Sequence, residues 1–114
     1  MSARDLGRIS QHDIMENRVM DLVIREITRA RLRFPTFNSK HEGLAITEEE
    51  FLELRKSIFE HGTNEQILEE AIQTAAMAIC LAVECLPEDV IHRAFIYEGQ
   101  QEMHPTSVRV DEKR

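Results

Sequence analysis

The chain has 114 residues, the length of one small domain, of which 42% are hydrophobic and 31% are charged. This composition is typical of a folded globular protein and argues against an intrinsically disordered chain. The net charge of −7 argues against a nucleic-acid-binding surface, which needs clustered Lys and Arg. Because we find neither a signal peptide nor an apolar run of roughly 18 to 20 residues, we expect a cytoplasmic protein that contacts no membrane.

The first predicted helix runs from His12 to about Arg33. Its apolar residues recur three and four positions apart, as in an amphipathic helix, and they are Ile14, Val19, Leu22, Val23, Ile27 and Ala30. Pro35 ends this helix, because the residue before a proline is pushed out of the helical region. The preceding residues, 1–11, are polar and contain a glycine, so we predict a loose lead-in there.

The second predicted helix begins near Lys40 and ends at His61-Gly62. Ser39 followed by Glu42 has the spacing of a capping box, in which each side chain accepts a hydrogen bond from the backbone N–H of the other residue. We expect the glycine to terminate the helix.

The third predicted helix runs from about Glu65 to Cys85, with Asn64 as its cap and Pro87 beyond its end. From Ala71 onward the sequence is apolar nearly all round the helix. We therefore expect this helix at the buried centre of a bundle or of a dimer.

The last part of the chain adds a short helix and a tail. Residues 88–97 can form a fourth helix with an apolar stripe, and residues 98–114 are predicted to be a polar tail. The fold class is therefore all-α, in a single domain over residues 12–97. We expect a helical bundle of three long helices and a short fourth, completed by dimerisation.

Carboxylates are concentrated on one side of the second predicted helix. Glu50 and Glu53 are three positions apart, hence about 60° apart around the helix axis, and Glu49 lies beside them. On the third predicted helix Glu70 and Gln73 have the same spacing, so antiparallel packing would bring the two pairs face to face. Carboxylates that converge inside a helical bundle can form a metal site, and an all-oxygen set favours Mg²⁺ or Mn²⁺.

These spacings allow two interpretations. A divalent cation would neutralise the repulsion between the carboxylates, hold phosphate oxygens and activate a water molecule. Alternatively, the glutamates of the second helix form a solvated acidic first half of that helix, which the helix dipole favours.

The middle of the chain contains three segments, FNSKHEG (37–43), EEFLEL (49–54) and EEAIQTAAMA (69–78). Together they resemble the MazG-like all-α nucleoside triphosphate pyrophosphohydrolases, particularly the short phage and bacterial members. The pattern of that family is Glu-Glu-x-x-Glu on one helix and Glu-x-x-Asp on the next. In it, the second and third glutamates of the first motif and both acids of the second bind Mg²⁺.

The resemblance implies a role for seven residues of this chain. Four are expected to bind Mg²⁺, or Mn²⁺ in its place, and these are Glu50, Glu53, Glu70 and Gln73. Glu49 is expected to act in catalysis by helping to position the water or a second metal ion, and Asn38 and His41 are expected to contact the nucleotide. Gln73 departs from the pattern, because it replaces an acid with a neutral amide that still offers a carbonyl oxygen.

The activity implied by the resemblance is hydrolysis of a nucleoside triphosphate, or a related nucleotide, to monophosphate and pyrophosphate. The family's usual assembly implies a homodimer or homotetramer. The alternative is a noncatalytic helical interaction or oligomerisation module with the same fold, which the loss of an acid at Gln73 permits.

Five further side chains have two interpretations each. Phe34 and Phe37 either stack on a base or pack into the core beside the entry of the second helix. The basic side chains either meet a triphosphate or are ordinary exposed helix residues, and these are Arg31, Arg33 and Lys56.

Overall fold

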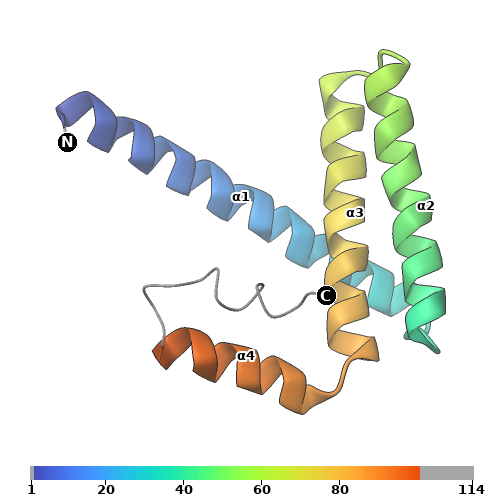
Figure 1. Ribbon diagram of the computed structural model, residues 1–114. Coiled ribbons are helices and arrows are strands. Elements are labelled where there is room, and N and C mark those ends of the chain that lie inside the picture. Colours follow the sequence, from blue (N-terminus) through green and yellow to red (C-terminus); the bar gives the residue numbers. More distant parts are fainter. Residues whose placement is uncertain (1, 101–114) are drawn as a thin grey trace.

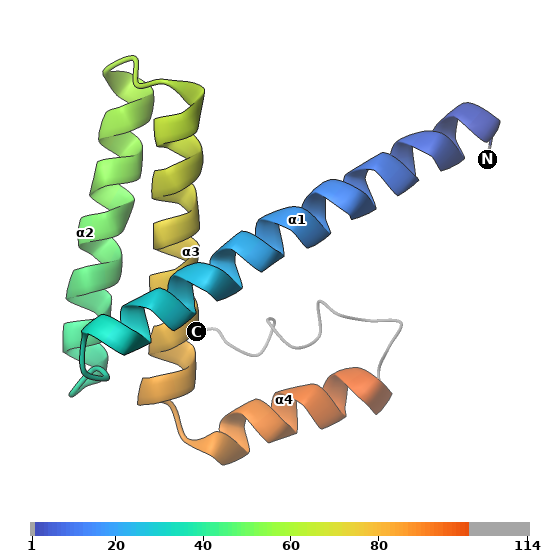
Figure 2. The same cartoon turned by 180° about the vertical axis from the view of Figure 1, so that it is seen from behind.

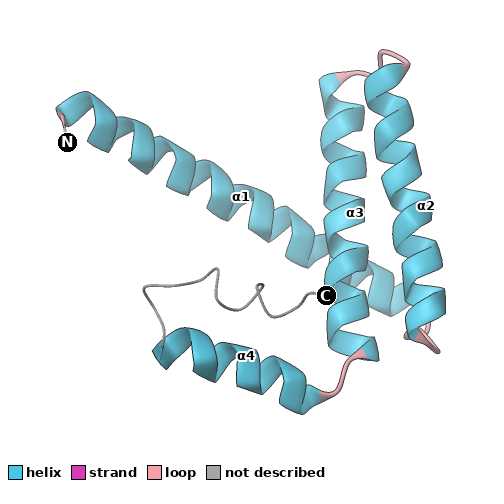
Figure 3. Ribbon diagram, in the orientation of Figure 1, coloured by secondary structure: helices cyan, strands magenta, loops and turns pink. Residues whose placement is uncertain are grey.

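The computed structural model describes residues 2–100, and within that range it has four α-helices and no β-strand (Figures 1 and 3). The helices are α1 (Ala3–Arg33), α2 (Lys40–Phe59), α3 (Asn64–Cys85) and α4 (Glu88–Gln100). The predicted all-α class, with three long helices and a shorter fourth, is confirmed. Completion of the bundle by dimerisation stays a prediction.

The helices α2 and α3 lie side by side as an antiparallel hairpin, and α1 crosses α3 obliquely on one side of it. Figure 1 shows α1 behind α3 and Figure 2 shows it in front. The main packing contacts join α3 to α2 and α3 to α1, so the third helix is central, as predicted. Its predicted burial is only partial, because only Ile72, Ala76 and Cys80 of α3 are buried. The N-terminal half of α1 extends away from the hairpin (Figure 1).

The hydrophobic core lies where α1 crosses α3, and it is small. Its buried residues are Val23, Ile27, Ile72, Ala76 and Cys80, with Leu22, Phe37, Ala75 and Met77 packed against them. Gly43 of α2 is also buried. A Cβ atom there would lie 3.0 Å from Phe37 Cδ2 and 3.1 Å from Leu81 Cδ1, so the glycine lets α2 approach its neighbours closely.

The start of α1 differs from the prediction, because the helix begins at Ala3 and not at His12. Ser2 and Asp5 form a capping box, in which the backbone N–H of Asp5 donates to Ser2 Oγ over 3.2 Å and the backbone N–H of Ser2 donates to Asp5 Oδ2 over 3.3 Å. The Ser-x-x-Asp spacing that starts the helix thus lies within the predicted lead-in. The predicted end before Pro35 is confirmed, since α1 ends at Arg33.

The caps between α2 and α3 also differ from the prediction. Thr63, and not Asn64, is the N-cap of α3, and it forms a capping box with Gln66. At the end of α2 it is His61 that takes the left-handed conformation, with φ at 62°. Gly62 is needed for another reason, because a Cβ atom there would lie 2.8 Å from the carbonyl oxygen of Ser57.

The predicted fourth helix is confirmed, and α4 continues to Gln100. The predicted polar tail, 98–114, therefore has its first three residues in a helix, and the rest of it lies outside the described residues.

The helix α3 has the length and hydropathy of a membrane-spanning segment. It contains 22 residues, and its most apolar window has a mean hydropathy of 1.3. Core helices of soluble bundles share these two properties, so cytoplasmic localisation and the absence of membrane contact stay predictions.

Candidate functional site

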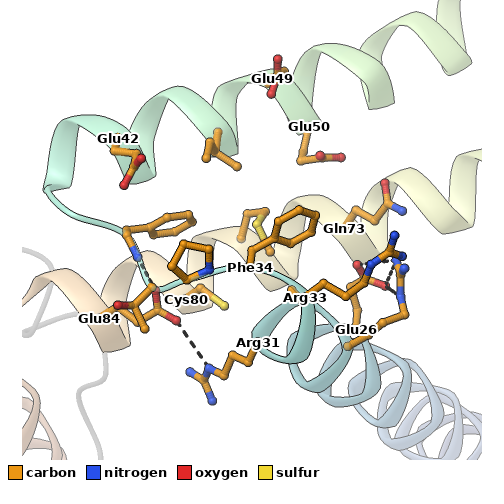
Figure 4. A pocket seen from close by; sticks show the side chains of 17 residues that line it. Glu26, Arg31, Arg33, Phe34, Glu42, Glu49, Glu50, Gln73, Cys80 and Glu84 are labelled. Carbon is orange, nitrogen blue, oxygen red and sulfur yellow. Dashed lines mark hydrogen bonds and ion pairs between the residues drawn. The ribbon is translucent and has the colours of Figure 1, made fainter.

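A pocket of about 540 Å³ lies between α2 and the connection that joins α1 to α2 (Figure 4). Its volume is within the range of small-molecule sites, about 300 to 1,000 Å³. Its walls come from the C-terminal end of α1, the connection, the first half of α2 and the middle of α3, and they include Glu26, Arg33, Phe34, Pro35, Phe37, Glu42, Ile46, Glu49, Glu50, Gln73, Met77, Cys80 and Glu84.

One stripe of α2 forms a wall of the pocket. Glu42, Ile46, Glu49 and Glu50 are spaced four, seven and eight residues from the first, which places them on one face of a helix. The stripe is polar at both ends and apolar in the middle. The Ser39 hydroxyl accepts a hydrogen bond from the backbone N–H of Glu42 over 3.1 Å, so Ser39 caps α2 as predicted. The predicted capping box is only half formed, because the Glu42 carboxylate accepts from the backbone N–H of Asn38 and not from that of Ser39.

The facing wall is held by a carboxylate from α3. Glu84 Oε1 accepts a hydrogen bond from the backbone N–H of Phe37 over 3.0 Å, and Glu84 Oε2 accepts one from Arg31 Nε over 3.4 Å (Figure 4). The Glu84 side chain is only 10% exposed, so the bond to Phe37 is shielded from water. Burial raises the pKa of the neighbouring Cys80 thiol, which keeps this end of the pocket free of a thiolate.

Two predicted metal ligands meet at one amide where α2 and α3 face each other. With its amide turned to satisfy its neighbours, Gln73 donates hydrogen bonds to Glu50 Oε1 over 3.0 Å and to Glu70 Oε1 over 3.3 Å. The antiparallel packing inferred from the sequence therefore brings Glu50, Glu70 and Gln73 together. A neutral amide satisfies hydrogen-bonding capacity but leaves both negative charges uncompensated.

The two carboxyl groups that Gln73 joins also have raised pKa values. Burial raises the pKa of Glu50, and the negative charges of four other carboxylates raise it further; in order of effect they are Glu70, Glu49, Glu53 and Glu26. Burial also raises the pKa of Glu70, followed by the charges of Glu53 and Glu69. A partly buried group of like charges with raised pKa values is typical of a functional site.

Glu26 of α1, like Glu84, lines the pocket although the sequence did not indicate it. It lines the pocket with Glu49 and Glu50, and its carboxylate accepts two hydrogen bonds from Arg29 Nη2, over 2.9 and 2.8 Å. The local signal is an ordinary i,i+3 ion pair on a helix, which gives no indication of a site. Only the crossing of α1 over α3 brings this carboxylate to the others.

The remaining predicted residues lie in different positions. Glu53 is close enough for its charge to raise the pKa values of Glu50 and Glu70, although it does not line the pocket. Asn38 and His41 are exposed and do not line it either, so nucleotide contact by these two stays a prediction. Phe34, Phe37, Arg31 and Arg33 all line the pocket, whereas Lys56 does not.

A divalent cation suits this site by the chemistry of its donors. No group of three or more His, Cys, Asp or Glu side chains placed to hold a metal ion is present in the described part of the chain. However, Glu50 of α2 and Glu70 of α3 both accept hydrogen bonds from Gln73, and within residues 2–100 neither of them forms an ion pair. Oxygen donors with uncompensated charge fit Mg²⁺ or Mn²⁺.

Comparison of this chain with models of protein families, with curated proteins and with solved structures finds no match.

Proposed function

We propose that this chain catalyses the Mg²⁺-dependent hydrolysis of a nucleoside triphosphate, or a related nucleotide, to monophosphate and pyrophosphate, with Mn²⁺ able to replace Mg²⁺. The observation that carries the proposal is the convergence of Glu50 and Glu70 on Gln73. Of these three, Glu50 and Gln73 line one end of a pocket of nucleotide size, and Glu70 lies behind them on α3. Two aromatic side chains, Phe34 and Phe37, line the pocket together with apolar residues, as is common in sites that bind flat ligands.

Different residues of the chain bind the cation and activate the water. Glu50, Glu53, Glu70 and the amide oxygen of Gln73 hold the cation, which requires the amide to turn over from its hydrogen-bonded orientation. When bound, the cation neutralises phosphate charge and lowers the pKa of the attacking water. Glu49 positions that water and takes its proton. The water oxygen forms a bond to the α-phosphorus as the bond to the bridging oxygen breaks, and pyrophosphate leaves with that oxygen.

We also propose that the chain works as a homodimer or homotetramer in the cytoplasm. Large apolar side chains are exposed on every helix, among them Met20, Leu32, Leu44, Phe59 and Phe95. The radius of gyration is 16.9 Å, against about 13 Å for a compact domain of about 100 residues. A second copy would cover these side chains.

One observation favours the noncatalytic alternative, a helical interaction module. The amide of Gln73 already joins Glu50 to Glu70 across the two helices. This arrangement stabilises the α2–α3 pair without any cation, which an aspartate at the same position would not do.

A thermal-shift titration with Mg²⁺ and with Mn²⁺ separates the two functions. For the enzyme, cation at ten times its dissociation constant stabilises the fold by about 1.4 kcal/mol, which raises Tm by several degrees. Glu70→Ala removes a ligand and should abolish the shift, whereas Glu48→Ala, at an exposed position of α2 outside the pocket, should retain it. Gln73→Asp restores the family's acid and should strengthen metal binding.

Pyrophosphate release from a panel of nucleoside triphosphates then tests the reaction itself. We expect release that depends on Mg²⁺ and is lost in Glu50→Ala and Glu70→Ala. Absence of both a metal-dependent shift and pyrophosphate release at millimolar metal would contradict the hydrolase and support the interaction module.

A further inference from the structure

We propose that the pocket selects nucleotides whose base carries an exocyclic amino group, as cytosine does, and that Glu42 accepts a hydrogen bond from that group. This inference rests on the proposed function, because it takes the Glu50 end of the pocket as the phosphate end. It assigns a role to a residue that the sequence explains only as part of a helix cap.

The distance along α2 between Glu42 and Glu50 matches the length of a nucleotide. Glu42 and Glu50 lie on the same pocket-lining stripe of α2, eight residues apart and therefore about 12 Å apart along the helix. A nucleoside with its first phosphate spans a comparable length. With the α-phosphate beside Glu50, the outer edge of the base reaches Glu42.

The space between these two carboxylates is apolar and suits a flat ring. Ile46 lies between them on α2, and Phe34, Pro35, Phe37 and Met77 line the pocket from the connection and α3. Aromatic and apolar side chains stack on bases with little preference for base type. The apolar wall therefore binds any base, and the polar group at its end determines which base is accepted.

Glu42 has an oxygen available for this contact. Its Oε1 accepts a hydrogen bond from the backbone N–H of Asn38, which holds the side chain at the edge of the pocket. Within residues 2–100, no hydrogen bond is made to the other oxygen, Oε2. The other acid at this end, Glu84, differs, because both of its oxygens are used by Phe37 and Arg31.

A carboxylate oxygen accepts hydrogen bonds and cannot donate them. The 4-amino group of cytosine points an N–H away from the ring, whereas uracil presents a carbonyl oxygen at the same position. The carbonyl oxygen of uracil would face a carboxylate oxygen of Glu42, and two acceptors repel each other and form no hydrogen bond. A site of this kind rejects the mismatched base by tenfold or more.

The test compares dCMP with dUMP by isothermal titration calorimetry in Mg²⁺, and dCTP with dUTP by pyrophosphate release. These pairs differ only at the pyrimidine 4-position and the adjacent ring nitrogen. We expect the wild-type protein to bind dCMP at least about tenfold more tightly than dUMP. Equal affinity for the two overturns the proposal, and this comparison requires no variant.

Glu42→Gln provides the sharper test. The variant keeps a carbonyl oxygen for the N–H of Asn38 and places an NH₂ donor where Oε2 stood. The dCMP to dUMP affinity ratio should fall by about tenfold or more, toward dUMP. Glu48→Gln, on the same helix but outside the pocket, should leave the ratio at its wild-type value. A ratio that Glu42→Gln does not change overturns the assignment of Glu42.

The two proposals can fail separately. Pyrophosphate release with no preference between dCTP and dUTP refutes the base selection and leaves the hydrolase intact. Preferential binding of dCMP without pyrophosphate release from any nucleotide refutes the hydrolase and supports the base selection.

Discussion

Gly43→Ala tests how α2 is placed against the rest of the structure. The added Cβ atom would lie 3.0 Å from Phe37 Cδ2 and 3.1 Å from Leu81 Cγ and Cδ1. Ordinary carbon–carbon contacts are about 3.5 to 4.0 Å, so the overlap is about half an ångström on each of two sides. Phe37 cannot yield freely, because its backbone is held by Glu84.

The magnitude follows from two opposing effects. Overpacking of this kind costs about 1 to 3 kcal/mol, and replacing a helical glycine by alanine returns about 1 kcal/mol of helix propensity. The expected net loss is about 1 kcal/mol, which lowers the Tm of a domain of this size by about 4 to 8 °C. The shifted Phe37 ring should also weaken nucleotide binding.

Gly7→Ala is the matched control. Gly7 is in α1, and a Cβ atom there has nothing within 4 Å, so this variant should gain about 0.5 to 1 kcal/mol. Urea denaturation of both variants and the wild type measures the free energies of unfolding. The difference between the variants isolates the packing cost, expected at about 1 to 3 kcal/mol. If Gly43→Ala gains as much stability as Gly7→Ala, the inference that α2 packs closely at Gly43 is refuted.

Three further predictions concern charge, backbone strain and the pocket wall. The pKa of Glu50 is raised in the folded state above its ordinary 4.5. As pH rises from 4.5, the unfolded chain therefore loses a proton that the folded protein still holds. The contribution of this carboxyl to the free energy of unfolding thus falls as pH rises toward neutrality. In EDTA, Glu50→Gln should therefore exceed the wild type in Tm by an amount that grows between pH 4 and 7; a constant difference would contradict this. His61→Gly relieves a left-handed non-glycine residue and should add about 1 kcal/mol in urea denaturation, whereas unchanged stability would show that the site is unstrained. Glu84→Ala leaves the shielded Phe37 N–H without an acceptor and should cost about 1 to 3 kcal/mol, with nucleotide affinity falling as well; a neutral effect in calorimetry and denaturation would mean that Glu84 does not hold the wall.

Several features of the site follow from the sequence because they depend on neighbours within one or two helical turns. The prolines stop α1 and α3 close to the predicted ends, and Ser39 caps α2. The spacing of Glu50 and Glu53, and of Glu70 and Gln73, fixes which side of each helix carries oxygen donors. A short hairpin connection then makes α2 and α3 antiparallel, so the meeting of Glu50 with Glu70 could be predicted.

Some helix ends were predicted less well, although they too depend on residues within one or two helical turns. Ser2 with Asp5 and Thr63 with Gln66 form the capping boxes. Thr63 is next to Asn64, which is also a good cap residue, and Ser2 lies well before the apolar stripe from which the start of the first helix was predicted. At the end of α2, the left-handed position falls on His61, and the glycine beside it is required for the close approach to the carbonyl oxygen of Ser57.

The sequence by itself thus determined the helices, their order and the acidic faces of α2 and α3, since backbone hydrogen bonds and side-chain periodicity are set by nearby residues. The angle at which α1 crosses α3 depends on how core side chains fit together, and periodicity does not encode it. That crossing brings Glu26 to the other carboxylates and lets Glu84 reach Phe37, 47 residues away. The placing of Glu50, Glu53 and Glu70 on their helix faces is therefore a local property of the sequence, and the pocket beside them exists only in the tertiary structure.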